Sequence, residues 1–565
     1  MKVSNIFLVI RAFFSGVKLK DFFSIGSNDQ KKKKRSIAVK AGKGLVAVLL
    51  WLCMIIGFGS FMMMFGFTFY SVESLGHLTG HGAGLSVVLA TFASSLMVFI
   101  FGFMTGTDVL YKGKDIALLR SLPLTEGEVI SSRILILLVY LIPIHLAIVI
   151  PALVVFFIVN PFSLASITGS LIVLLITPLV PAALSCILTM TTCRVGGRGP
   201  GKLVVQMVVF CAMLVLLSLF QVGGMQYFSA NLSMEDISNM GGLIAFLSVN
   251  VDKVLRFVPT CLWLAGSLVP SSALLDSVLS IVFGFAVFAL TSWLLSVSYV
   301  NLASSFEAGD ARSRKSKTKN VQPEYRRRSV MTALALRDWD IIRGSSSFLF
   351  ELIGESVVPL LLMTVYGIMG LLDDISMGVG MLSQFDFFPL IVCAVLLLMQ
   401  GVDMISSTSA SREGKTFPLN RVYPVDGMVY VKAKLVVHLI ATAVPYAIYC
   451  VMALALFRMS IWHIAWMLPL GFAFSVAMCF EGLAIDFNKP FLTWKNPQQA
   501  VKQNANGLKS MGLALFQLLI LGGGFYLLDR FIGLLAGAGW IAACLAVMLI
   551  VSWHFVSKAA EAAYN

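Results

Sequence analysis

Long apolar stretches recur along almost the whole chain of 565 residues and set the strongest limit on its fold. A helix of about 20 apolar residues crosses the hydrocarbon core of a bilayer, where every backbone polar group is bonded within the segment. Twelve stretches reach this length: 44–71, 83–106, 134–158, 164–191, 203–221, 275–299, 348–371, 386–409, 433–457, 461–482, 510–528 and 535–556. The pattern predicts an all-α polytopic membrane protein with about 12 transmembrane helices.

Composition supports this prediction and excludes an ordinary soluble protein. Hydrophobic residues make up 58% of the chain, charged residues make up 12%, and the mean hydropathy is +0.90. Soluble domains carry roughly twice that charged fraction. A further apolar piece at 255–270 fits a thirteenth crossing, a re-entrant segment or an outer structural cap.

The basic residues are distributed unevenly and predict the orientation. If both termini are cytoplasmic, 38 of the 42 Lys and Arg residues fall on the cytoplasmic side, which is the pattern of the positive-inside rule. The net charge of +14 is therefore topogenic, and the runs Lys31–Arg35 and Arg312–Arg328 are expected to contact anionic lipid headgroups. A nucleic-acid partner is not expected.

The spans divide into two halves of six. We expect a cytoplasmic or interfacial segment at 1–43, a first half at 44–299, a basic linker with an interfacial helix at 300–346, and a second half at 347–565. Amphipathic segments before each half are expected to lie in the membrane interface. Two halves of equal polarity imply a parallel pseudo-two-fold repeat, which is common in transport proteins.

A charged loop follows the second span of each half. The first copy reads K-D-I-A-L-L-R-S-L-P-L-T and the second reads K-T-F-P-L-N-R-V-Y-P-V-D. The shared positions are Lys114 and Lys415, Leu118 and Leu419, Arg120 and Arg421, and Pro123 and Pro424, with Arg133 and Lys434 ten residues past the prolines. Thr125 with Glu128 forms a capping-box pattern, and Asp426 is the matching N-cap candidate. Each loop is expected to present a short helix at the cytoplasmic surface.

Other motifs are weaker. Gly196–Lys202 matches the spacing of a phosphate-binding loop, but Leu203 stands where a Ser or Thr must reach Mg²⁺, so no nucleotide site is expected in this chain. Glu73, His77 and His81 have one-face helical spacing for a metal, although glycines interrupt that helix. The nine cysteines are scattered, and no metal site is expected. Asp403 and Glu481 lie within spans and fit either a transport pathway or a helix end.

The loops resemble those of ABC exporter permeases that work with a separate ATPase. The last cytoplasmic loop, Asp486–Asn504, and the segment Ala335–Gly344 are similar to that family as well. The resemblance implies coupling helices at about 112–123 and 412–424 that bind ATP-binding subunits, expected in two copies, which hold the ATP and Mg²⁺. It also implies an exported substrate and a bacterial cytoplasmic membrane with both termini inside. The implied coupling residues are Lys114, Asp115, Leu118, Arg120, Pro123, Arg412, Glu413, Lys415, Leu419, Arg421 and Pro424.

Three other classes stay open, and one of them is a structural or sensory membrane subunit whose ATPase drives no transport. A twelve-span, ion-coupled secondary transporter also has two six-span halves and a basic central linker, but the carboxylate relays of such proteins are missing from these spans. A polytopic membrane enzyme would need the group of Glu73, His77 and His81. The sequence does not identify the substrate.

Overall fold

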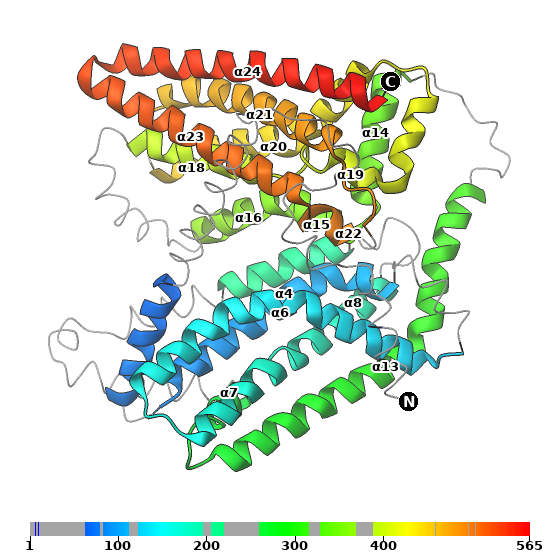
Figure 1. The fold of residues 1–565 in the computed structure, drawn as a ribbon, viewed down its shortest axis with the longest axis vertical. Helices are drawn as coiled ribbons and strands as arrows, with labels where there is room; N and C mark the ends of the chain where they lie inside the picture. The colour runs from blue at the N-terminus through cyan, green and yellow to red at the C-terminus, as the bar shows by residue number, and fades with distance from the viewer. Residues whose placement is uncertain are drawn as a thin grey trace, which may run out of the picture. The chain divides into compact units, whose positions relative to one another are not determined.

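The protein is described by a computed structural model that covers most of the predicted spans. The described residues are 63–78, 83–111, 123–195, 205–219, 259–315, 328–368, 388–457, 459–494, 497–502 and 504–564, together with Ile6 and Ile10. They form helices joined by turns, without a β-strand in these ranges (Figure 1). The prediction of an all-α polytopic membrane protein is confirmed.

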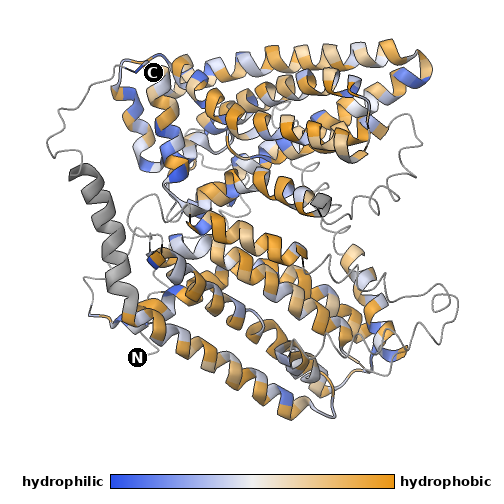
Figure 2. Cartoon of the chain, turned by 180° about the vertical axis from the view of Figure 1, so that it is seen from behind, coloured by the Kyte–Doolittle hydropathy of each residue, from blue (hydrophilic) through white to orange (hydrophobic). Residues whose placement is uncertain are grey.

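Eight long helical segments within the described ranges are apolar enough to cross a membrane. They are α4 (Leu85–Tyr111), α6 (Glu126–Val159), α7 (Leu164–Ile176) joined to α8 (Leu179–Val195), α13 (Ala273–Lys315), α20 (Gly427–Phe457), α21 (Trp462–Asn488), α23 (Ala505–Phe531) and α24 (Leu534–Tyr564). Shorter apolar helices are Val205–Leu219, α16 (Gly354–Ile368) and α18 (Phe388–Val402). Hydrophobic residues dominate along the long helices (Figure 2). The expected first span at 44–71 lies mostly outside the described residues.

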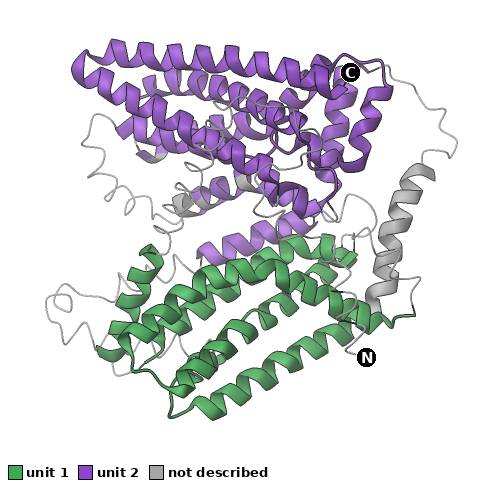
Figure 3. Cartoon of the chain, viewed as in Figure 1, with its two compact units in different colours: residues 1–202, 224–312 green, residues 203–223, 313–565 purple. Residues whose placement is uncertain are grey.

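The chain forms two compact units (Figure 3). Unit 1 comprises residues 1–202 and 224–312, and unit 2 comprises residues 203–223 and 313–565. The helix Val205–Leu219 therefore groups with the second unit, where the ring of Phe210 packs against Phe350 at 4.9 Å between centroids. The expected linker begins at residue 300, whereas helix α13 continues to Lys315.

Close helix packing in unit 1 depends on small residues. A Cβ atom on Gly102 would lie 2.4 Å from the Ser185 hydroxyl oxygen, and one on Gly106 would lie 2.7 Å from that of Thr189. Only glycine fits at such distances, so α4 and α8 approach through a small-xxx-small pattern. The residues of α6 complete this core, with Ile134 and Leu137 fully buried.

The apolar piece at 255–270 contains a short helix in unit 1. Helix α12 (Pro259–Gly266) packs on α4 and α7, with Cys261 and Leu264 buried. It has only eight residues. Residues 255–258 of this piece lie outside the described residues, so a thirteenth crossing or a re-entrant segment stays a prediction.

Unit 2 is built around the packed helices α20, α21, α23 and α24. Three shorter helices, α14 (Val330–Arg343), α15 (Ser346–Leu352) and α22 (Pro497–Lys502), lie against one another or against α20 and the residues around 409. The expected span at 348–371 is divided into α15 and α16 at Ile353. Helices α21 and α23 extend beyond their apolar stretches, and these extensions carry Asp486 and Asn506 into the protein interior. Lys434 is buried as well, near the start of α20.

Candidate functional site

The second copy of the charged loop forms two short helical segments between α18 and α20. Helix α19 spans Ser409–Glu413, and the 3₁₀ segment η2 spans Gly414–Val422. The Asp403 carboxylate accepts a hydrogen bond from the backbone N–H of Ile405. This local turn offers the chain an alternative to continuing α18, which ends at Val402. The predicted short helix at 412–424 is thus a 3₁₀ segment preceded by one turn of α-helix.

Gly414 makes the junction of the two segments possible. Its φ angle is +58°, a value that residues with a side chain rarely adopt. A Cβ atom at this position would lie 3.0 Å from the ring of Trp494. The Trp494 indole Nε1 in turn donates to the Ser411 carbonyl oxygen at 2.7 Å. The last cytoplasmic loop therefore packs directly on the junction.

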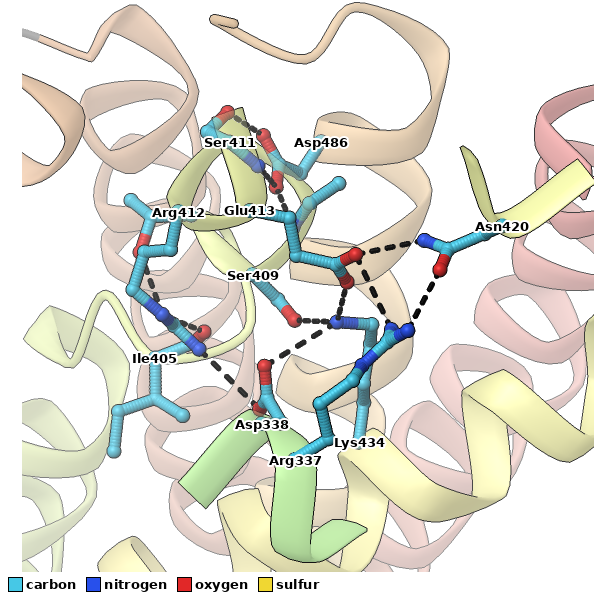
Figure 4. Close-up of polar contacts among 12 residues, drawn as sticks. Arg337, Asp338, Ile405, Ser409, Ser411, Arg412, Glu413, Asn420, Lys434 and Asp486 are labelled. Carbon is cyan, nitrogen blue, oxygen red and sulfur yellow. Dashed lines mark hydrogen bonds and ion pairs between the residues drawn. The ribbon is translucent and has the colours of Figure 1, made fainter. Parts of the chain in front are cut away.

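Asp486 from α21 fixes the start of α19 (Figure 4). Its carboxylate accepts hydrogen bonds from the backbone N–H groups of Ala410 at 2.6 Å and Ser411 at 2.9 Å, and from the Asn506 amide at 2.9 Å. The first N–H groups of a helix have no partner inside the helix, and a negative charge there is favourable. Because Asp486 is fully buried, these bonds join α19 firmly to α21 and α23.

A buried ionic network then joins the loop to α14 and α20 (Figure 4). Asp338 of α14 lies 3.5 Å from Arg412 and 3.4 Å from Lys434, and Glu413 lies 2.9 Å from Lys434. All four side chains are at most 5% exposed. Arg337, which is more exposed, adds a contact of 3.2 Å to Glu413. We call these five residues the ionic network.

Four of the five charges in the ionic network, those of Arg337, Arg412, Glu413 and Lys434, have further hydrogen bonds. Arg412 donates to the Ile405 carbonyl oxygen at 2.6 Å, Lys434 donates to the Ser409 hydroxyl at 2.7 Å, and Asn420 donates to Glu413 at 2.7 Å. Buried charges are tolerated when they are paired and bonded in this way. Burial by itself would raise the pKa of Asp338, but Lys434 and Arg412 together hold it below its usual value. Asp338 is therefore a carboxylate at neutral pH.

The opposite side of the loop is exposed. Phe417 and Asn420 point inward, and the Phe417 ring packs against Tyr564 at 5.5 Å between centroids. Exposed residues on either side of these two form a surface that we call the 415–424 face: Lys415, Leu419, Arg421, Val422, Tyr423 and Pro424. Leu419 is 58% exposed and Val422 is 77% exposed. Basic and apolar side chains therefore stand side by side on a segment held from beneath by buried charges.

Arg421 has a structural contact as well. Its guanidinium donates to the Ala563 carbonyl oxygen at 2.9 Å, near the C-terminal end of α24. Such a cation satisfies a carbonyl group that the helix leaves without a partner. A change at Arg421 would consequently affect both the surface and the end of α24. Lys415, Leu419 and Val422 report on the surface more cleanly.

The first copy of the loop is described only at its end. Lys114, Asp115, Leu118 and Arg120 lie outside the described residues, while Pro123 precedes α6. The expected capping box is present, because the Thr125 hydroxyl accepts from the Glu128 N–H and the Glu128 carboxylate accepts from the Thr125 N–H. Arg133 is buried and donates to the Val109 carbonyl oxygen at 3.5 Å. In the second copy, Asp426 accepts from the Met428 N–H at 3.0 Å, as expected of an N-cap.

Comparison with known proteins gives the family. A family described as membrane protein of 12 TMs matches residues 52–554. The chain belongs to this family. No curated protein and no solved structure matches the chain. Membership establishes a multi-pass membrane protein of twelve spans, in agreement with the twelve apolar stretches of the sequence.

In this 12-TM protein the other candidate residues have structural partners. Glu73 is buried and accepts from the backbone N–H groups of Gly84 and Ser86 at 2.8 and 2.9 Å, around the start of α4. The His77 ring bonds to the Asn160 amide at 3.0 Å, and His81 lies outside the described residues. No group of three metal-ligating side chains occurs in the described part of the chain. Glu73 thus stabilises a helix start.

The two carboxylates expected within spans lie in different settings. Asp403 is buried at the end of α18, as its bond to Ile405 indicates. Glu481 of α21 accepts a hydrogen bond of 2.7 Å from the Gln517 amide of α23.

Sequence reasoning missed the residues that support the loop from beneath. Asp338 was part of the expected interfacial segment Ala335–Gly344, and Asp486 was the first residue of the expected last cytoplasmic loop. Asp338 lies within the amphipathic helix α14, and Asp486 lies near the polar end of α21. The signal that could have found these two residues is that Asp338 and Asp486 are acidic, although they lie in segments where an excess of basic residues sets the topology.

Proposed function

We propose that this 12-TM protein is the membrane-spanning permease subunit of an ATP-driven exporter. In this proposal the chain forms the substrate pathway, and separate ATP-binding subunits, expected in two copies, hold the ATP and Mg²⁺ and supply the energy. The observation that carries the proposal is the 415–424 face, an exposed basic and apolar surface fixed to membrane-spanning helices by the ionic network. Basic residues around this surface support its cytoplasmic location with both termini inside. The resemblance to exporter permeases is what suggests a bacterial cytoplasmic membrane.

The ionic network suits the transmission of motion. Lys434 belongs to α20 and Asp486 to α21, so a displacement of α19 acts directly on two membrane-spanning helices. A flexible loop would absorb such a displacement in its own backbone. Breaking a buried ion pair costs about 3–5 kcal/mol, so the loop and the helices are expected to move as one body.

The shape of the 415–424 face fits a soluble partner. Interfaces between proteins combine an apolar centre with a polar rim, and Arg and Tyr are enriched there. Leu419, Val422 and Tyr423 supply the apolar centre, while Lys415 and Arg421 supply positive charge. We expect an acidic or neutral groove on the ATP-binding subunit to receive this face.

A reconstitution experiment tests the proposal. The chain is placed in proteoliposomes with the ATP-binding protein encoded beside its gene, and ATP hydrolysis is measured with wild type and with the double variant Leu419→Asp/Val422→Asp. We expect the permease-stimulated part of ATP hydrolysis to fall by on the order of tenfold, as for the loss of interface anchors. Neither side chain is buried, so the double variant is expected to fold. Size-exclusion chromatography checks this expectation.

Val330→Asp is the matched control. Val330 is 54% exposed at the start of α14 and receives the same apolar-to-acid change outside the 415–424 face. It is expected to leave ATP hydrolysis unchanged. Unaltered stimulation in the double variant would refute the coupling assignment. Transport that continues without any ATP-binding protein and stops when the ion gradient is removed would favour a secondary transporter instead.

A further inference from the structure

Unit 1 contains a cavity of about 310 Å³ between its membrane-spanning helices. It is lined by side chains from α4, α7, α8, α12 and α13 and from the turn between α7 and α8. Most of these side chains are apolar, including Phe92, Phe99, Val180 and Leu264. Known ligand sites have volumes of about 300–1,000 Å³ and predominantly apolar walls with a few polar groups. The cavity is thus large enough for part of a lipid-sized molecule.

Two hydroxyl groups in the wall lack hydrogen-bond partners. Thr177, at the turn between α7 and α8, is 3% exposed, and Ser280 of α13 is 5% exposed. Both residues line the cavity, and neither side-chain oxygen has a partner among the described residues. A buried hydroxyl without a partner is unfavourable, so these two groups point to a missing hydrogen-bonding ligand.

Buried hydroxyls without a partner among the described residues also occur away from the cavity, at Ser86, Ser131 and Ser292, whereas two hydroxyls on α8 show the usual bonded arrangement. On α8, Ser185 donates to the Ala182 carbonyl oxygen at 2.7 Å and Thr189 donates to the Ser185 carbonyl oxygen at 2.8 Å. Such bonds to a preceding turn are the usual solution for Ser and Thr in helices. Thr177 and Ser280 do not adopt it.

The wall formed by α12 is held in place by close backbone packing. A Cβ atom on Gly169 of α7 would lie 2.4 Å from the Ser267 carbonyl oxygen, and one on Gly84 would lie 3.5 Å from the Ala265 side chain. The Trp263 ring packs edge-on against Phe283 at 5.9 Å between centroids. The cavity is therefore bounded by a fixed helix and does not depend on a loose connection.

We propose that this cavity binds one acyl chain of a membrane amphiphile, with a carbonyl oxygen near the chain accepting hydrogen bonds from Thr177 and Ser280. The surrounding helices are apolar enough to lie in a bilayer, so acyl chains are the molecules that reach the cavity. Leu184 and Phe283 in its wall are 46% and 38% exposed, which gives a chain a point of entry at the surface of unit 1. This inference does not depend on coupling to an ATPase.

Photo-crosslinking of the full chain in lipid nanodiscs tests the proposal. The probes are methyl palmitate carrying a diazirine near the chain end and a hydrocarbon diazirine of similar length without the ester. Labelled peptides are then identified by mass spectrometry. With the ester probe we expect labelling concentrated on α4 and α12, and competition by excess unlabelled methyl palmitate. Even labelling over exposed apolar residues, without competition, would overturn the proposal.

Two sets of variants sharpen the experiment. Val180→Trp fills the cavity and is expected to lower labelling on the order of tenfold, while Leu175→Trp, at a 71% exposed position on α7, is expected to leave it unchanged. The pair Thr177→Val/Ser280→Ala is expected to lower labelling by the ester probe about threefold to tenfold, without changing the hydrocarbon probe. Equal loss of labelling for both probes in the Thr177→Val/Ser280→Ala variant would overturn the assigned hydrogen bonds. If Val180→Trp does not fold, competition in the wild-type protein still tests the site.

Discussion

The ionic network of unit 2 and the cavity of unit 1 bury polar groups in opposite ways. Unit 2 places charged side chains in its interior and pairs them with one another, as Asp338 does with Arg412 and Lys434. The cavity of unit 1 is lined by uncharged residues and contains two hydroxyls without a partner. A buried charge without a partner costs far more free energy than a buried hydroxyl without one, so only the hydroxyl can be left for a ligand to satisfy. The ionic network is thus suited to a fixed connection, and the cavity is suited to a ligand that enters and leaves.

Removing one charge from the ionic network is expected to have the largest effect. Asp338→Ala leaves Arg412 and Lys434 buried with fewer opposite charges, which costs about 3–5 kcal/mol of the free energy of unfolding. The change is measured as the shift in thermal unfolding of the purified protein in detergent. Asp340→Ala is the matched control on the same helix, because Asp340 is exposed and pairs only with exposed Arg343 among the contacts described. It is expected to shift unfolding little.

A small effect of Asp338→Ala, similar to that of Asp340→Ala, would contradict the comparison. Unit 2 would then tolerate an uncompensated buried charge, and the connection from the loop to α20 would depend on packing alone. The same result would weaken the argument that the 415–424 face moves together with the membrane-spanning helices.

Acid pH is expected to weaken the network in a specific direction. Because the pKa of Asp338 is held below its usual value in the folded protein, the carboxylate contributes stability above its unfolded pKa of about 3.9. That contribution is lost as the pH falls through the lower, folded-state pKa. The difference in unfolding temperature between wild type and Asp338→Asn is therefore expected to be constant near neutral pH and to shrink below about pH 4. A difference that grows on acidification would show that Asp338 is protonated in the native state.

Local signals in the sequence predicted much of the fold. Apolar length located the spans, and the Thr125–Glu128 pattern predicted a capping box that the structure contains. These features depend on residues within one helix or one turn. The repeated proline, with a basic residue ten positions after it, also identified the loop that carries the 415–424 face. The 3₁₀ geometry of this loop was not predicted.

The support of the loop was not predictable because it joins distant residues. Asp338 is 74 residues from Arg412 and 96 residues from Lys434 along the chain. An acid on an amphipathic segment looks alike in sequence whether it faces headgroups or a buried arginine. The cavity was hidden for a similar reason, because the sequence does not show whether a threonine hydroxyl in an apolar stretch finds a carbonyl oxygen, as that of Thr189 does and that of Thr177 does not.

The smallest expected effect is a difference in stability between valine variants of Thr177 and Thr189, measured without added ligand. Thr177→Val keeps the shape of the side chain and removes a hydroxyl that has no partner, so we expect unfolding to be unchanged or stabilised by up to about 1 kcal/mol. Thr189→Val removes a bonded hydroxyl and is expected to destabilise by about 1 kcal/mol. Thermal unfolding in a delipidating detergent measures both variants. Adding methyl palmitate is expected to stabilise wild type and Thr189→Val more than Thr177→Val. Equal stabilisation of all three proteins would show that the ester does not bond to Thr177.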